Sequence, residues 1–209
     1  MTYLFIILYA ITLVYFALSE RVKKFIWLLA IQGIILFGIV FYSLNEIEIF
    51  DFIFILLETI IVKSLLIPSF LNKIRKHNQL KREDEPSIPV FYSIIVVVIS
   101  ILISFLLSNY LNDIHLHTQY FTISFASVIF GIYFIIIHKN IYSHLVGYLI
   151  IENGIFLLSL AVGNVMPLMV NLAVLLDVFM GVLVLGIFIN RIGDTFNSVK
   201  LDQISKLKD

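Results

Sequence analysis

Seven long apolar segments constrain this chain more than any other feature of its sequence. A transmembrane helix needs about 20 mostly apolar residues, the length that crosses the hydrocarbon core of a bilayer. The segments are far longer than strands and do not alternate between apolar and polar residues, so we expect helices. The predicted spans are residues 3–18, 25–44, 50–71, 90–111, 120–137, 141–162 and 168–189. We therefore predict an all-α integral membrane protein with seven transmembrane helices.

Composition excludes several classes of protein. Hydrophobic residues make up 61% of the 209 residues and charged residues 13%, whereas a soluble domain carries about 25% charged residues. The apolar excess rules out a soluble enzyme, and the formal net charge of zero argues against a nucleic-acid partner. The chain has no Cys and no Gly-rich phosphate loop, nucleophile elbow or HExxH motif. We expect this chain to have no catalytic residues, no cofactor and no metal site.

The loop charges predict an orientation. The loops after the first, third, fifth and seventh segments carry 13 of the 14 basic residues, and the opposite loops carry acidic residues with no Lys or Arg. Basic loops face the cytoplasm, so the N-terminus is predicted outside and the C-terminus in the cytoplasm. We expect a multi-pass protein of the cell inner (cytoplasmic) membrane. The basic loop residues are Arg21, Lys23, Lys24, Lys73, Arg75, Lys76, Lys81, Arg82, Lys139, Arg191, Lys200, Lys206 and Lys208.

Four ionisable residues fall near the middle of predicted spans: Glu58, Lys63, Glu152 and Asp177. Each costs roughly 2.5–3.5 kcal/mol at that depth, so such groups need a partner or a wet cavity. The first interpretation is a relay for protons or small cations, because ionisable residues inside a membrane are functional by default. The alternative is a set of ion pairs that only hold helices together.

Helix geometry refines these expectations. Glu58 and Lys63 are five residues apart, which in an α-helix separates them by about 140° around the axis. We therefore expect them to find partners on different neighbouring helices. His144, Tyr148 and Glu152 recur every four residues and share one helix face. His144 and Tyr148 form either a path by which protons reach Glu152 or an interfacial His with an aromatic-belt Tyr.

Glycines and a proline inside the spans have simpler interpretations. Gly147, Gly154, Gly181 and Gly186 are expected to mark close helix packing and not hinges. Pro68, late in the third segment, is a candidate for a kink.

The first three and the last three segments share features that indicate an internal duplication. AIQGIILFGI (30–39) resembles LIIENGIFLL (149–158), which places Gln32 where Glu152 stands, and ILLE (55–58) resembles VLLD (174–177). Both groups of three also run in the same direction. We predict two parallel three-helix units joined by the fourth span. Their bounds are 1–72 for the first unit, 73–118 for the linker, fourth helix and outer loop, 119–192 for the second unit and 193–209 for a cytoplasmic tail.

These same residues resemble a known family. The second unit, with GYLIIENGIF around Glu152 and VLLDVFMGVLV around Asp177, resembles the K subunit of respiratory complex I and the related C subunit of multisubunit cation/proton antiporters. Asp177 departs from the usual second Glu, and the tail LDQISKLK (201–208) resembles the short C-terminal segment of that subunit. With ETIIVKSLLIP around Glu58 and Lys63, the whole chain is similar to component E of hydrogenase-4, a membrane subunit of formate-hydrogenlyase-type, group 4 hydrogenase complexes.

The resemblance implies a non-catalytic membrane subunit of a redox-driven ion-translocating complex. Its implied partners are antiporter-like membrane subunits and the membrane subunit that anchors the redox arm. Glu152 and Asp177 would be relay carboxylates, and Glu58 and Lys63 would continue the path in the first unit. Three alternatives stay open: a stand-alone secondary transporter with a midplane site, a subunit of a multisubunit Na⁺/H⁺ antiporter, and a passive scaffold.

Overall fold

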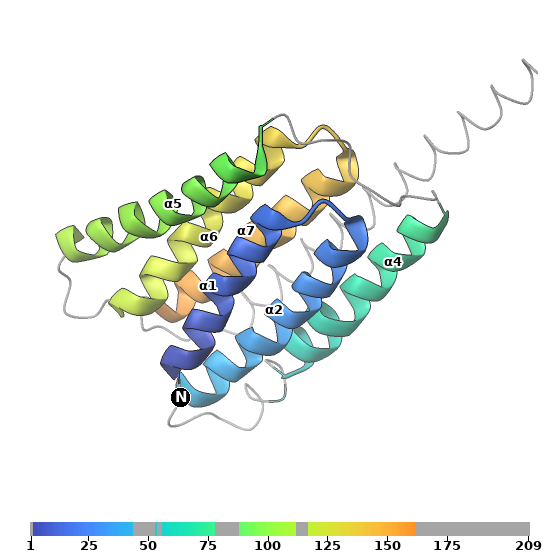
Figure 1. The fold of residues 1–209 in the computed structure, drawn as a ribbon. Coiled ribbons are helices and arrows are strands. Elements are labelled where there is room, and N and C mark those ends of the chain that lie inside the picture. Colours follow the sequence, from blue (N-terminus) through green and yellow to red (C-terminus); the bar gives the residue numbers. More distant parts are fainter. Residues whose placement is uncertain (1, 44–52, 54–55, 78–87, 112–116, 162–209) are drawn as a thin grey trace, which may run out of the picture.

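A computed structural model describes residues 2–43, 53, 56–77, 88–111 and 117–161, nearly all of which lie in helices (Figure 1). The described residues contain no strand. The helices are α1 (Thr2–Leu18), α2 (Val22–Ser43), η1 (Leu57–Leu66), α4 (Ile67–His77), α5 (Val90–Leu111), α6 (Thr118–Ile137) and α7 (Ile141–Ala161).

These helices correspond to the first six predicted apolar segments, with η1 and α4 together forming the third. Among the described residues, four helices are long and apolar enough to cross a membrane, at residues 22–42, 90–111, 118–137 and 142–161, and α1 is a shorter apolar helix. The predicted all-helical, membrane-type fold is therefore confirmed. The seventh segment, which would complete the second unit, and the tail at 193–209 lie outside the described residues, so the count of seven and the topology stay predictions.

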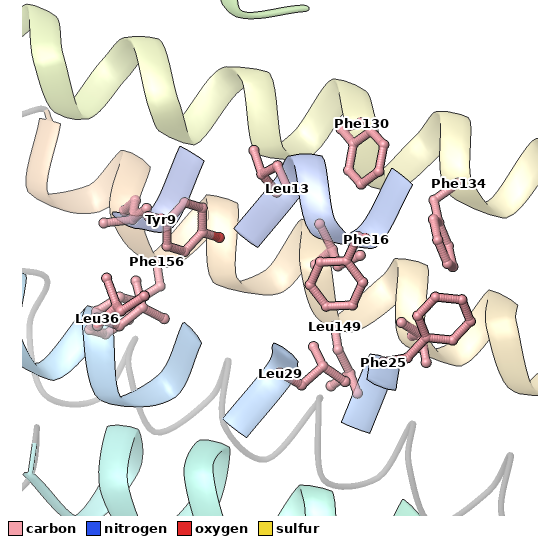
Figure 2. Packing of buried hydrophobic residues seen from close by; sticks show 14 of the residues in the cluster. Tyr9, Leu13, Phe16, Phe25, Leu29, Leu36, Phe130, Phe134, Leu149 and Phe156 are labelled. Atoms are coloured by element: carbon pink, nitrogen blue, oxygen red, sulfur yellow. The ribbon is translucent and has the colours of Figure 1, made fainter. Parts of the chain in front are cut away.

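An aromatic and aliphatic core fills the space between α1, α2, α6 and α7 (Figure 2). Phe16, Phe25 and Phe134 meet there, with ring centroids 5.3–6.2 Å apart. By contrast, α5 contributes mainly small residues to the interior and leaves its large apolar side chains exposed. Exposed aliphatic side chains are compatible with lipid around a spanning helix.

Glycines bring α6 and α7 into close contact. A Cβ atom added to Gly131 would lie 3.0 Å from the Gly147 carbonyl oxygen, and one added to Gly147 would lie 3.1 Å from the Gly131 carbonyl oxygen. Further along the pair, a Cβ on Gly154 would lie 2.9 Å from the carbonyl oxygen of Ser124. The packing role predicted for Gly147 and Gly154 is confirmed. Gly181 and Gly186 lie outside the described residues.

Three of the predicted cytoplasmic segments lie at one end of the bundle. The α1–α2 loop, the C-terminal end of α4 and the α6–α7 loop share that end (Figure 1). The cations of these segments are Arg21, Lys23, Lys24, Lys73, Arg75, Lys76 and Lys139. This placement agrees with the prediction that they share one side of the membrane, and the identity of that side stays a prediction.

The middle of the third segment is a π-helix, in which each backbone N–H bonds the carbonyl five residues earlier. Ile67 N–H donates to the Val62 carbonyl in this pattern. The next residue, Pro68, has no N–H to continue the pattern, and the chain proceeds as the α-helix α4. Pro68 thus lies where the two helix types join. π-Helical turns are rare and occur frequently at functional sites.

Candidate functional site

A buried cluster of three charged side chains joins η1 to α7. Lys63 Nζ lies 2.7 Å from Glu152 Oε1 and 3.5 Å from Glu58 Oε1. The side chains of Lys63, Glu58 and Glu152 are 5%, 1% and 5% exposed. We call these three residues the ion cluster. Three of the four predicted relay residues therefore meet in one place, and Asp177 lies outside the described residues.

The π-helix corrects one prediction from the sequence. In an α-helix Glu58 and Lys63 would point in directions about 140° apart, and separate partners were expected. The π-helix has one more residue in each hydrogen-bonded turn, so residues five apart become neighbours on one face. This is why Glu58 and Lys63 form an ion pair, and the prediction that they would not pair was wrong. Lys63 does also find a partner on another helix, Glu152.

The charges of the ion cluster do not balance. Two carboxylates and one ammonium give a net charge of −1 when all three are ionised. In addition, among the described residues neither Glu58 Oε2 nor Glu152 Oε2 has a hydrogen-bond donor, and both are buried. A buried acceptor without a donor and an uncompensated buried charge are both costly. When all three groups are ionised, the cluster therefore carries one negative charge that no described residue compensates.

The immediate surroundings of Lys63 are partly aromatic and partly hollow. Its Nζ lies 4.2 Å from the ring centroid of Phe156, one turn after Glu152 on α7, which adds a cation–π contact. A small cavity of about 10 Å³ lies beside Lys63 and Glu152, close to the minimum that holds one water molecule. The remaining residues that line this cavity are Leu29, Ile67, Leu149 and Asn153.

A hydrogen-bonded polar layer begins beside Glu152 and crosses the bundle. Asn153 Nδ2 donates to Gln32 Oε1 at 3.1 Å, and Gln32 Nε2 donates to Thr12 Oγ1 at 2.9 Å. Thr12 in turn donates to the Tyr9 carbonyl at 2.6 Å. The Tyr9 hydroxyl lies 3.1 Å from Ser127 Oγ, which itself donates to the carbonyl of Ile150. We call Tyr9, Thr12, Gln32, Ser127 and Asn153 the polar layer.

The sequence did not identify the polar layer as a unit. Gln32 was noted for its position in the repeat, and the other four residues carry no charge that would separate them from ordinary span residues. All five are buried. The sequence did contain one indication of this layer, namely Gln32 inside a span and Asn153 directly after Glu152, because uncharged polar side chains inside a bundle form hydrogen bonds across helices.

His144 and Tyr148, the predicted path to Glu152, lie on α7 toward the end that carries the basic loops, and both are half-buried. His144 Nε2 lies 2.7 Å from the His138 carbonyl oxygen, so this ring bridges the start of α7 to the residue that follows α6. That bond gives His144 a structural role. Whether His144 and Tyr148 also pass protons stays a prediction.

His138, in the α6–α7 loop, gives a pH-dependent contribution to stability. Burial lowers the pKa of His138, the hydrogen bond from its ring to the Phe134 carbonyl (2.8 Å) opposes that shift, and neighbouring His144 lowers it further. Glu20 of the α1–α2 loop lines the same small cavity as His138. Because burial and His144 both lower the pKa of His138, the folded protein prefers the neutral imidazole.

We expect the melting temperature of the detergent-solubilised protein to fall as pH is lowered through about 6.5, the usual pKa of His. Below that pH the unfolded chain binds a proton that the folded chain does not, so the free energy of unfolding decreases. Each kcal/mol lost from the free energy of unfolding lowers the melting temperature of a chain of this size by about 2–4 °C, so the fall can be followed by thermal melting. His138→Asn, which keeps a donor near the Phe134 carbonyl, should flatten the curve, and an equal slope in both proteins would contradict the assignment.

Among the described residues, no group of three or more His, Asp or Glu side chains is arranged to hold a metal ion.

Comparison with known proteins adds a distant relationship. The chain is 29% identical over 86 residues to an uncharacterized protein of Mycobacterium tuberculosis, Rv0085. The match covers 41% of this chain and 39% of that protein. No family model matches the chain. No solved structure matches it.

Proposed function

We propose that this chain is a non-catalytic membrane subunit of a redox-driven ion-translocating complex, hydrogenase-4-like or complex I-like, in which the ion cluster relays protons. One observation carries the proposal. Lys63 lies between two buried carboxylates, 2.7 Å from Glu152 and 3.5 Å from Glu58, in a cluster whose full ionisation leaves an excess negative charge. Ionisable residues in this position mark ion pathways more often than structural contacts.

The chemistry of the ion cluster suits a proton relay. With one proton added, the cluster is neutral, and that proton can reside on either Glu58 or Glu152. The carboxylate that stays ionised pairs with Lys63. Transfer of the proton from one acid to the other therefore changes which carboxylate pairs with the ammonium group. Two carboxylates from different helices that share one ammonium group, at 2.7 and 3.5 Å, supply the two proton positions that a relay requires.

The polar layer supports a route in the plane of the membrane. Asn153 follows Glu152 directly, and its hydrogen bonds continue through Gln32 of α2 to α1. From there Tyr9 reaches Ser127 of α6. Glu152 and Asn153 line the same small cavity, so the ion cluster adjoins the polar layer, although no hydrogen bond joins the Glu152 carboxylate to that layer among the described residues. This arrangement fits a subunit that links neighbouring subunits laterally, as the resemblance to the complex I and hydrogenase-4 subunits implies.

The identity of the partners follows from the resemblance. We propose antiporter-like membrane subunits and the membrane subunit that anchors a redox arm. Co-purification of these proteins with the tagged full-length chain tests this assembly. Isolation of a stable oligomer of this chain alone, from membranes of its own cells, would favour the stand-alone transporter.

Glu152→Gln tests the relay. The variant is nearly isosteric, and we expect the complex to assemble while redox-driven proton movement into inverted membrane vesicles falls on the order of 10²-fold, as for other positioned proton-transfer groups. The measurement is quenching of a pH-sensitive dye after addition of H₂, formate or NADH, normalised to the amount of assembled complex. Glu152→Asp, which keeps the carboxylate, should retain part of the activity. Unchanged pumping in Glu152→Gln would refute the relay role of this residue.

A further inference from the structure

A second candidate site opens on the outer face of the bundle and reaches, at one end, the residue that follows Lys63 of the ion cluster. A cavity of about 360 Å³ lies between α2 on one side and η1 with α4 on the other, helices that run next to each other in Figure 1. Its size falls in the range of pockets that bind small molecules. Its lining is mostly apolar, with Lys23, Asn72 and Ser69 among its members. We call it the lateral groove.

Polar and apolar residues are separated along the lateral groove. Lys23, at the start of α2, and Asn72, in the middle of α4, lie toward the end of the bundle that carries the basic loops. Trp27 follows one turn deeper, where Trp side chains favour the boundary between headgroups and hydrocarbon. The deeper wall is mostly apolar and consists of Ala30, Ile31, Ile34 and Leu65, with Ser64 at its deep end. One end of the groove thus suits an anion, and the rest suits a hydrocarbon chain.

The length of the lateral groove matches one leaflet of a bilayer. From Lys23 to Ile34, α2 rises by about 16 Å, close to half of a hydrocarbon core that is about 30 Å thick. At its deep end the groove is lined by Ser64, the neighbour of Lys63, whose expected depth is the membrane centre. The groove therefore extends from headgroup level to the midplane, the path of a single acyl chain.

From this arrangement we propose that the lateral groove binds an anionic glycerophospholipid of the leaflet on the basic side. Its phosphate lies beside Lys23 and Asn72, and one acyl chain lies along Ile31, Ile34 and Leu65. Basic pockets between transmembrane helices recognise anionic lipid headgroups in this way. The exposed indole of Trp27, 64% accessible, contacts the lipid just below its headgroup.

Trp27 provides a direct test, because it is the single Trp of the chain. The full-length protein is reconstituted in phosphatidylcholine vesicles that contain a minor fraction of brominated lipid, either phosphatidylglycerol or phosphatidylcholine. Bromine quenches a Trp that it touches. We expect brominated phosphatidylglycerol to occupy the groove about fivefold more than brominated phosphatidylcholine at the same fraction, the preference that one basic residue gives.

Two variants and a matched control separate a binding site from bulk attraction. Lys23→Gln should abolish the preference, whereas Lys24→Gln, an exposed neighbour that does not line the groove, should retain it. Ala30→Phe fills the groove and should reduce quenching by both lipids. Equal quenching by the two lipids, or equal loss in both lysine variants, would overturn the proposal. Absence of quenching by either lipid would also overturn it, because the groove would then be covered by protein.

Discussion

Lys63→Met is expected to abolish redox-driven proton movement and to lower the stability of the protein. The substitution keeps the length of the side chain but leaves two carboxylates, 1% and 5% exposed, without their shared cation. Removal of one partner from a buried ion pair costs about 3–5 kcal/mol when the other charge remains. Protonation of Glu58 and Glu152 would reduce that cost. Both acids would then hold their protons, and neither could accept one from the other. The measurements are the melting temperature in detergent and dye quenching in inverted vesicles.

A triple variant separates a relay from a purely structural ion cluster. Glu58→Gln, Lys63→Met and Glu152→Gln together remove every charge, and replacement of a buried ionic group by neutral groups of similar volume is often neutral or stabilising. If the cluster only holds η1 against α7, the triple variant should recover both stability and coupled proton movement. The relay predicts recovered stability with no coupled proton movement. Restored proton pumping in the triple variant would refute the relay hypothesis and favour a passive scaffold.

The apolar segments of the sequence predicted most of the described fold because hydrophobic length is a strong signal in a membrane protein. The predicted fourth segment, residues 90–111, has the same bounds as α5. The third segment shows where this reasoning stops. Hydropathy located it, but every angular argument assumed 3.6 residues per turn, and the π-helix places Glu58 beside Lys63 instead. Backbone hydrogen bonding of this kind depends on tertiary packing and leaves no periodic pattern in the residues.

The candidate site was predicted in part for a related reason. Charged residues in an apolar span are conspicuous, so Glu58, Lys63 and Glu152 could be selected from the sequence, although their meeting point could not. Thr12 and Ser127 were not selected, because Ser and Thr are common in transmembrane helices and commonly bond to the backbone of their own helix. Their role depends on which helices face each other, and that information comes from the packing of α1, α2, α6 and α7.

The contact between α2 and the π-helix gives a second prediction with a large effect. A Cβ on Gly33 would lie 3.0 Å from both the Ser64 nitrogen and the Thr59 carbonyl oxygen. These atoms belong to the backbone of η1, so they cannot move aside as the end of a side chain can. Ser64 directly follows Lys63, and a shift of this backbone moves Lys63 relative to Glu152. Gly33 is therefore a point of close backbone contact between α2 and the part of η1 that carries Lys63.

We expect Gly33→Ala to weaken coupled proton movement and Gly33→Val to remove most of it. Overpacking of this kind costs about 1–3 kcal/mol, or a few degrees in melting temperature. Gly38→Ala is the matched control, since it lies on the same helix and the atoms nearest to its Cβ belong to the ring of Phe5, on α1. The control should lose stability to a similar extent and keep its coupling, because nothing in that contact touches η1. Equal coupling in the Gly33 and Gly38 variants at equal stability would show that the position of the π-helix does not govern proton movement.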